Sequence, residues 1–230
     1  WTELSDFDNG TFSCRALCIP PSDPDTAYAG LLNDIAKTTD SGETWELISS
    51  APAEFLSMEA DHEDGSLLYG GSVNQGVFKS ADGARTWSSA NQGIRANTIY
   101  DTAVDPEGTG TILCGTLAGV YSYTDNGMWN KLNSSSSEAV IFHPHNPETL
   151  YIGCDWSLKK STDAGNSWIY INTPDQTEGN KVTALDLISE SDTADTVIAG
   201  ISFSSGKRGQ IIKITGWEYD IYQDMETLLE

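Results

Sequence analysis

The feature that most constrains this chain is a short tryptophan box that recurs about every forty residues. Four copies align, each with an aspartate, a turn and a closing tryptophan, at residues 38–45, 80–87, 123–129 and 161–168. The closing tryptophans are spaced 42, 42 and 39 residues apart, and Trp1 and Trp217 continue the series in both directions. Self-similarity at a period of this length predicts a repeat architecture, in which each unit packs against its neighbours.

Each period is interpreted as four short strands. In the second repeat the apolar runs predict strands at residues 56–60, 67–71 and 77–80, and a fourth that opens at Trp87. Pro, Asp, Asn and Gly, the residues that turns require, separate these runs. First strands such as residues 139–142 are the most apolar, so we expect them to be buried on both faces. Four-stranded units of this length predict an all-β fold, a β-propeller of four-stranded antiparallel blades.

The boxes resemble the Asp-box, or BNR, repeat, whose form is roughly Ser/Thr-x-Asp-x-Gly-x-Thr-Trp. The copies at residues 38–45 and 161–168 are complete or nearly so, the second has Ala84 in place of glycine, and the third is one residue short. The repeat occurs in sialidases, xyloglucan-degrading hydrolases, sortilin-type receptors and photosystem II assembly factors. The resemblance therefore implies a propeller without selecting an activity.

The aspartate and tryptophan of each box are expected to be structural. The aspartate can accept hydrogen bonds from backbone amides of a tight hairpin, and the glycine allows a positive φ. The tryptophan can then cover the joint between neighbouring units. We assign this structural role, and no catalytic role, to Asp40, Trp45, Asp82, Trp87, Asp125, Trp129, Asp163 and Trp168.

The two ends of the chain indicate how many blades it holds. Residues 1–5 resemble the start of the fourth strand at residue 45, and the last complete repeat closes near Trp217. We therefore expect a single β-propeller domain over residues 1–230, with five complete repeats plus an orphan N-terminal outer strand. Because ring closure normally removes strand edges, the orphan strand favours part of a longer propeller over a closed five-bladed ring.

Charge restricts the classes of partner. The chain has 12 Lys and Arg against 34 Asp and Glu, and its formal net charge of −22 would repel nucleic acid and anionic membranes. No apolar run approaches the ~18 residues that a membrane helix needs. We expect another protein or a neutral glycan as the partner, and the family resemblance implies a secreted or extracytoplasmic location, in the periplasm or at the cell surface.

The four cysteines leave the redox compartment open. Cys14 and Cys18 are four residues apart in a predicted strand, so their Cα atoms would be too distant for a disulfide. Together with Cys114 and Cys154 they are expected to be buried thiols or to include one long-range disulfide.

Metal and cofactor signals are weak. Residues 6–10, Asp-Phe-Asp-Asn-Gly, resemble the start of a calcium loop, but the glycine is one position early and position twelve is Leu17 instead of glutamate. We expect no cofactor, although a looser calcium site stays open because carboxylates are abundant. His143 and His145 could be two metal ligands, but no third follows nearby, and the position of His143 matches a turn aspartate in other repeats.

A non-catalytic binding or scaffold propeller is the leading functional interpretation, because the chain has no GxSxG, HExxH or phosphate-binding glycine motif. In propellers the loop between the second and third strands opens onto one face, so residues there are candidate ligand contacts. Trp156, the one tryptophan outside the box register, would be an anchor or would pack against the neighbouring blade. The candidate ligand-binding residues are Asn33, Asp34, Asn74, Gln75, Asp155, Trp156 and Arg208.

Two glycosidase functions are alternatives. The segment at residues 151–156 is similar to one in xyloglucan-cleaving propellers, which implies Asp155 as a catalytic carboxylate and Trp156 as a sugar platform. Glycoside hydrolysis needs two carboxylates ~5–9.5 Å apart, and in that family they come from two propellers. A sialidase is less favoured, because it needs three arginines around an anionic sugar and Arg85 already lies inside a box.

Overall fold

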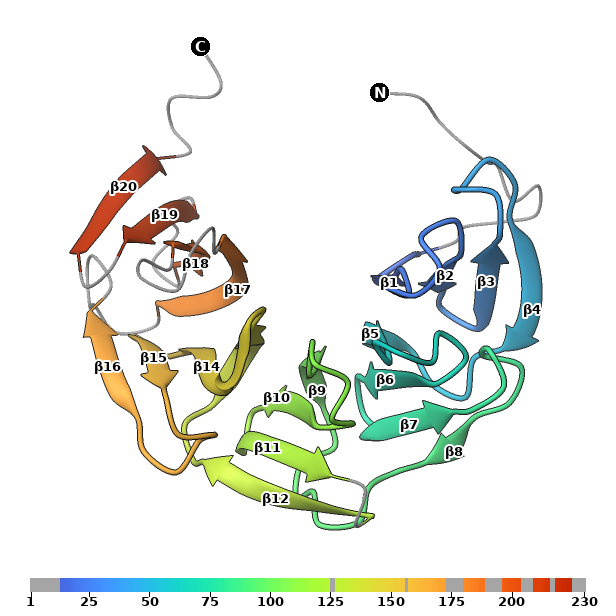
Figure 1. The fold of residues 1–230 in the computed structure, drawn as a ribbon, viewed down its shortest axis with the longest axis horizontal. Helices are drawn as coiled ribbons and strands as arrows, with labels where there is room; N and C mark the ends of the chain where they lie inside the picture. Colours follow the sequence, from blue (N-terminus) through green and yellow to red (C-terminus); the bar gives the residue numbers. More distant parts are fainter. Residues whose placement is uncertain are drawn as a thin grey trace. The chain divides into compact units, whose positions relative to one another are not determined.

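The computed structural model of the chain describes residues 13–124, 127–155, 157–172, 180–188, 196–203, 209–215 and 218–224, with the backbone alone for residues 172 and 218–224. Within these ranges the regular structure is all β, and 20 strands form five four-stranded sheets. In every sheet each strand is hydrogen-bonded to the next one in the sequence (Figure 1). The prediction of an all-β fold built from four-stranded units is confirmed.

The sheets follow one another along the chain. The first contains β1 (Ala16–Cys18), β2 (Ala27–Gly30), β3 (Asp34–Thr38) and β4 (Glu46–Ser50). The second contains β5 (Phe55–Ala60), β6 (Leu68–Ser72), β7 (Val77–Ser80) and β8 (Ser88–Ser89). The third contains β9 (Ile99–Val104), β10 (Ile112–Thr116), β11 (Gly119–Thr124) and β12 (Met128–Asn133). The fourth contains β13 (Ser137–His143), β14 (Asn146–Cys154), β15 (Ser157–Ser161) and β16 (Ile169–Asn172), and the fifth β17 (Lys181–Ile188), β18 (Thr196–Ser202), β19 (Gln210–Thr215) and β20 (Glu218–Asp224).

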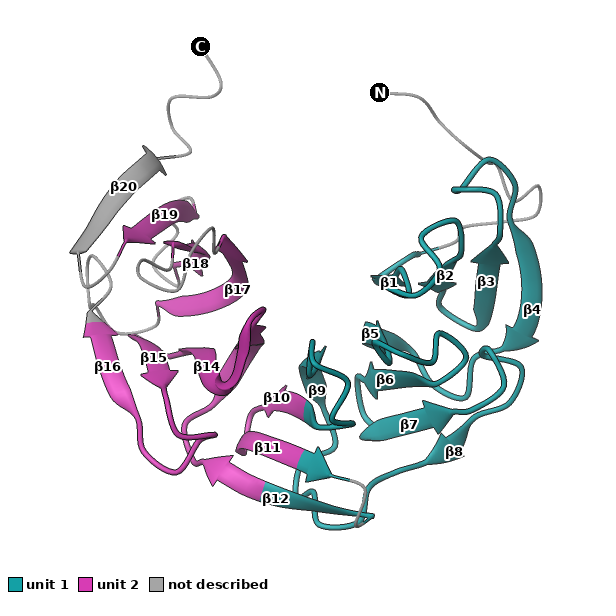
Figure 2. Ribbon diagram, viewed as in Figure 1, with its two compact units in different colours: residues 1–112, 123–130 teal, residues 113–122, 131–230 magenta. Residues whose placement is uncertain are grey.

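Figure 2 shows that the chain divides into two compact units. Unit 1 comprises residues 1–112 and 123–130, and unit 2 comprises residues 113–122 and 131–230, so the third sheet is divided between them. The single domain over residues 1–230 stays a prediction.

In the first three sheets, burial is greatest in the second strand. Every residue of β2, β6 and β10 is buried, whereas β17 alternates among buried, half-buried and exposed positions. Our expectation that the first strands would be buried on both faces holds for residues 139–142 of β13, where only Ile141 is half-buried, but it is wrong for β17. A second strand has a hydrogen-bonded neighbour on both edges, whereas a first strand has one on a single edge only.

Glycine in the second strand allows the next sheet to approach closely. A Cβ added to Gly71 on β6 would lie 2.6 Å from Cγ2 of Ile99 on β9, within unit 1. In unit 2, a Cβ on Gly153 of β14 would lie 2.7 Å from Cγ1 of Val182 on β17. Contacts under 3 Å cannot accommodate a side chain without a shift, so close packing of adjacent sheets explains why these strands carry glycine.

An aromatic group of the second sheet lies in a core cluster that spans the first two sheets of unit 1. The ring of Phe55 lies 4.9 Å from that of Trp87 and 6.0 Å from that of Phe78. The same cluster includes Ile35 from β3, so it spans both sheets. Phe55 is almost wholly buried, and burial of a side chain of this size contributes roughly 2–3 kcal/mol.

Several sequence predictions fall on residues that the structure does not describe. They concern the outer strand at residues 1–5, the calcium-like segment at residues 6–10, and Asp125, Trp156, Arg208 and Trp217. Among the described residues, no helical segment has the length and apolarity needed to cross a membrane.

Candidate functional site

The three described boxes share one hydrogen-bonded turn. Oδ1 of the aspartate accepts the backbone N–H four residues later, at 2.9 Å for Asp40 and Asp82 and 2.8 Å for Asp163. Oδ2 accepts the hydroxyl of that same later residue at 2.5 Å in each box. Hydrogen bonds from Thr38 and Thr44 lower the pKa of Asp40 to about 2. These carboxylates are thus engaged inside their own turns and are not available for acid–base chemistry.

Each box also has two successive residues with positive φ. In the fourth sheet they are Ala164, at φ 56°, and Gly165, at φ 87°. A Cβ on Gly165 would lie 2.7 Å from Leu132 Cδ1 on β12, so this turn packs closely against the preceding sheet. In the second box the backbone O of Ala84 accepts a 2.7 Å hydrogen bond from Ser49 Oγ on β4. The turns therefore contact the fourth strand of the sheet before them.

The box tryptophans do not all have the same contacts. Trp129 Nε1 donates a 2.7 Å hydrogen bond to the backbone O of Ala90, which follows β8, so its indole joins two sheets. Trp45 Nε1 donates to the backbone O of Gly42 in its own turn at 3.1 Å, and Trp168 makes the matching 3.0 Å bond. The indole of Trp129 thus bridges two sheets, as predicted for all the boxes. The indoles of Trp45 and Trp168 form a hydrogen bond within their own turn instead.

The lysine that precedes each box packs on a tyrosine of the neighbouring second strand. Such cation–π contacts contribute about 0.5–1 kcal/mol at exposed sites. The distances from Nζ to the ring centroid are 5.3 Å for Lys37 and Tyr28, 5.4 Å for Lys79 and Tyr69, and 5.0 Å for Lys160 and Tyr151.

The candidate residues of unit 1 lie in loops with anchored backbones. Asn33 lies between β2 and β3 and Asp34 begins β3, and the backbone O of Asn33 accepts the N–H of Ala51 at 2.8 Å. Asn74 and Gln75 occupy the same loop of the second sheet and are exposed. These two pairs therefore present polar side chains at corresponding positions of neighbouring sheets.

A β-bulge places one extra residue at the same position of three first strands. The register shifts leave Leu56 in β5, Glu138 in β13 and Thr183 in β17 without a residue opposite. Arg15 occupies the corresponding position before β1. The next residue, Ala16, pairs with Gly30 of β2, as the residue after each bulge pairs with a glycine of the second strand. Bulges often redirect a side chain next to a functional site.

At this bulge position, ion pairs join adjacent sheets in each unit. In unit 1, Arg15 Nε lies 3.0 Å from Oε1 of Glu54, which precedes β5. In unit 2, Lys181 Nζ donates a hydrogen bond to Oε1 of Glu138. The cation belongs to the earlier sheet in the first pair and to the later sheet in the second. Neither pair was predicted from the sequence, because the members of each lie about forty residues apart.

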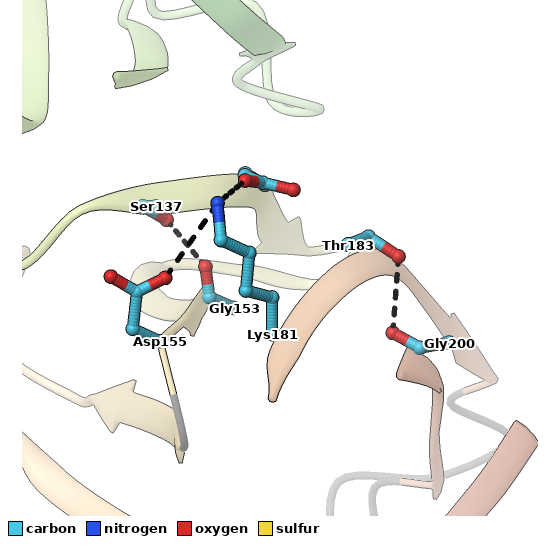
Figure 3. Close-up of polar contacts among 7 residues, drawn as sticks. Ser137, Gly153, Asp155, Lys181, Thr183 and Gly200 are labelled. Atoms are coloured by element: carbon cyan, nitrogen blue, oxygen red, sulfur yellow. Dashed lines mark hydrogen bonds and ion pairs between the residues drawn. The ribbon is translucent and has the colours of Figure 1, made fainter. Parts of the chain in front are cut away.

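Asp155 joins the second ion pair from the loop after β14. Its Oδ1 lies 4.0 Å from Lys181 Nζ, and its backbone forms an isolated bridge with Lys181. Figure 3 shows the Lys181 side chain reaching toward Asp155 near the start of β17. The Asp155 side chain is 43% exposed and that of Glu138 is 20% exposed. The structure therefore brings the candidate carboxylate beside a second carboxylate, with one ammonium group in contact with both.

Glu59 on β5 is a further unpredicted site residue. Burial raises its pKa to about 8, and the negative charge of Asp101 on β9 adds to the effect. Glu59 in turn contributes to the raised pKa of Cys18 on β1, which is due mainly to burial. Glu59 could have been noticed in the sequence, because it is a charged residue within a mostly apolar first strand. In β13 the residue at the same position is Ile141.

The cysteines are free thiols, with Cys14 exposed and the other three buried. Burial raises the pKa of Cys154 to about 11, so this thiol is not a ready nucleophile at neutral pH. His143 is buried, and its Nδ1 accepts the backbone N–H of His145 at 3.1 Å. In the described part of the chain, no three His, Cys, Asp or Glu side chains are grouped so that they could hold a metal ion.

His143 makes the same turn contact as an aspartate in other repeats. Oδ1 of Asp105 accepts the backbone N–H of Glu107 at 2.8 Å, and Oδ1 of Asp61 accepts that of Glu63 at 3.0 Å. The turns that align in the sequence therefore share one hydrogen bond, from the backbone N–H of a residue to the side chain of the residue two positions before it.

Comparison with known proteins supports the architecture. No protein-family model and no curated protein sequence matches the chain. The GH74 xyloglucanase from Xanthomonas campestris aligns with a TM-score of 0.73 at 15% identity, over 91% of this chain and 38% of that one. The extracellular domain of BT4673 from B. thetaiotaomicron aligns with a TM-score of 0.74 at 14% identity, over 99% and 30%. The chain has the β-propeller fold.

The alignment with a third solved structure includes a larger share of that structure. YCF48 bound to D1 peptide aligns with a TM-score of 0.68 at 13% identity, over 98% of this chain and 72% of that one. The chain spans about a third of the length of the GH74 and BT4673 structures. At these identities the likeness shows the fold alone.

Proposed function

We propose that this chain is a non-catalytic, extracytoplasmic propeller module that binds a protein partner as an assembly scaffold. The proposed contacts lie in the loops between second and third strands. They are Asn33, Asp34, Asn74 and Gln75 in unit 1 and Asp155 in unit 2, and also Trp156 and Arg208, which lie outside the described residues.

The observation that carries this proposal is an exposed leucine in the same loop of two sheets. Leu32, between β2 and β3, is 44% exposed, and Leu117, between β10 and β11, is 65% exposed. Polar neighbours such as Asn33 flank the exposed apolar side chain. Apolar contacts with a polar rim are typical of protein interfaces. A glycan platform would instead present aromatic rings, and the described residues of these two loops include none.

The alternative, part of a propeller glycoside hydrolase, draws support from the GH74 likeness and from the exposed Asp155 beside Glu138. The chemistry of this cluster favours it less. A retaining or inverting mechanism needs one carboxyl group that carries a proton. Lys181 is in contact with both carboxylates, so both are already engaged by one ammonium group between two sheets. This ion-pair cluster therefore suits a joint between sheets better than a general acid.

The proposed location and partner class have independent support. One solved structure of similar fold is an extracellular domain, and another is bound to a peptide. The net charge of −22 favours a partner whose contact surface is basic, because complementary charge accelerates encounter.

The test places a photo-crosslinking residue at Leu117 in the full chain, expressed in its own host, and identifies the captured protein by mass spectrometry. The purified partner is then titrated against the chain by calorimetry. We expect Leu117→Asp to weaken binding by at least about tenfold, because it buries a charge at an apolar contact.

The matched control is Leu47→Asp on β4, where the leucine is 50% exposed but lies on a fourth strand. It should leave the affinity unchanged. Equal affinity of the Leu117→Asp variant and the native chain would refute the proposed surface. Release of reducing ends from xyloglucan that is lost in Asp155→Asn would instead establish the hydrolase alternative.

A further inference from the structure

A cavity in unit 1 lies apart from the loops between second and third strands. Its volume is about 440 Å³, and its walls come from the turn after β1, from β2 and β3, from the turn before β6 and from the second box. This volume falls in the range of small-molecule sites. The charged lining residues are Asp23, Lys37, Asp82 and Arg85, and Tyr28 forms part of the wall.

Two cations converge on this cavity in a strongly acidic chain. Lys37 Nζ lies 5.3 Å from the Tyr28 ring centroid, and Arg85 Nη1 donates a 3.1 Å hydrogen bond to the backbone O of Asp82. Over the ranges that the structure describes, neither cation forms an ion pair with a carboxylate. The chain has only 12 Lys and Arg in total, and two of them line this cavity together with Asp23 and Asp82. The wall therefore offers cationic donors as well as carboxylate acceptors to a ligand.

Tyr28 supplies a phenol hydroxyl in the cavity wall. The residue as a whole is 2% exposed. A Cβ on Gly83 would lie 3.2 Å from this hydroxyl, so the glycine keeps the wall open beside it. Because burial raises the pKa of Tyr28, the phenol keeps its proton and can donate it to a bound anion.

The carboxylates in the wall retain acceptor capacity. Asp23 Oδ2 accepts a 2.7 Å hydrogen bond from Thr26, whereas a carboxylate can accept about four. Asp82 is used more fully, since it accepts bonds from Ser80 and Thr86. The wall can therefore accept hydrogen bonds from ligand hydroxyls as well as donate to a ligand carboxylate.

The basic residue of the second box is not required by the turn itself. The corresponding residues of two other boxes are Glu43 and Asn166, and those turns form the same hydrogen bonds. One Arg85 N–H bonds the backbone O of Asp82, as Asn166 bonds that of Asp163, and the other donors of the guanidinium can serve the cavity. Because the box with Glu43 keeps the aspartate bonds of the turn, replacement of Arg85 should leave the fold intact.

We propose that this cavity binds a small hydroxylated carboxylate of the hexuronic acid class. The carboxylate of the ligand lies between Lys37 and Arg85 and accepts the Tyr28 hydroxyl, while its ring hydroxyls donate to Asp23 and Asp82. This site uses other elements than the proposed protein-binding loops, so either function can fail without the other.

The experiment titrates D-glucuronate into the full chain by NMR or calorimetry, with D-glucose and acetate as comparison probes. We expect saturable binding of glucuronate and at least about tenfold weaker binding of the other two, because each lacks one set of contacts. Arg85→Gln and Lys37→Gln should each weaken glucuronate binding by ~10–100-fold, the usual range for loss of a charge-assisted hydrogen bond. Tyr28→Phe should weaken it less and leave the melting temperature unchanged.

The matched control is Lys79→Gln, which removes a lysine that packs on a tyrosine in the same way but lies outside the cavity. It should retain native affinity. Absence of saturable binding to the native chain would overturn the proposal, as would equal affinity for acetate and glucuronate. An equal loss in Lys79→Gln would indicate a general charge effect, and tighter Arg85-dependent binding of an acidic peptide would assign the cavity to a different ligand class.

Discussion

Glu59 gives the sharpest prediction about stability. Its pKa rises from an ordinary value of 4.5 to about 8 in the folded chain, first because of burial and second because of Asp101. The folded state therefore holds this proton more tightly than the unfolded state. The associated stability is fully present below about pH 4.5 and is lost as pH rises through about 8.

The size of the effect follows from that difference. At 1.36 kcal/mol for each pH unit between the two values, the ceiling is roughly 5 kcal/mol. Glu59 is half-buried, so solvent screening and local relaxation should reduce this to roughly 2 kcal/mol. Glu59→Gln removes the titration, so the variant should be more stable than the native chain by about this amount at pH 8.5, and the advantage should shrink toward pH 4.5.

The assay is urea unfolding followed by tryptophan fluorescence at half-unit steps from pH 4.5 to 9. Asp101→Asn should recover a smaller part of the stability at high pH, because it removes the secondary cause. Glu46→Gln on exposed β4 is the control and should leave the pH profile unchanged. If the free energies of unfolding of Glu59→Gln and the native chain keep a constant difference over this range, the reasoning is refuted.

Three further predictions test the boxes and the joints between sheets. Gly93→Ala should cost about 2–4 kcal/mol in urea unfolding, because φ is 99° and a Cβ would lie 2.3 Å from the backbone O of Trp129. Gly110→Ala, at φ 73° with no atom within 4 Å, should cost only about 1 kcal/mol, and equal losses would contradict the packing argument. Ala164→Gly should raise stability by about 0.5–1 kcal/mol, since the exposed alanine has φ 56°, and a decrease would contradict the strain argument. The pKa of Asp40 is lowered from 3.8 to about 2, so its stabilising effect is present above pH 3.8 and is lost toward pH 2. Asp40→Asn should therefore be less stable than the native chain at pH 7 and equally stable near pH 2. A difference in the free energy of unfolding that stays the same at both pH values would refute this.

The repeat and its strands could be predicted because their causes are local. Each box closes through bonds within eight residues, as between Asp40 and Thr44. The second-repeat predictions agree with β5, β6 and β7 to within one residue at each end. The predicted burial of first strands held for residues 139–142 but was wrong for β17, because burial depends on what packs against a strand and not on its apolar pattern alone.

The candidate site was predicted only in part. Asp155 was singled out from its place after a second strand, but its neighbours Glu138 and Lys181 were not. Glu138 projects from a bulge, and a bulge depends on the register between strands, which the apolar pattern does not specify to one residue. The cavity of unit 1 was likewise invisible, because Lys37 and Arg85 come from different sheets.

By itself the sequence determined the repeated unit of this protein: its length, its four strands and its aspartate turn, since hydrogen bonds and turn residues within each unit specify them. Only the tertiary structure decided which charges meet across sheets, which carboxyl is buried, and where a cavity forms between a turn and a box. These features arise from contacts between units, whose distances are set by strand register and by glycines that let backbones approach.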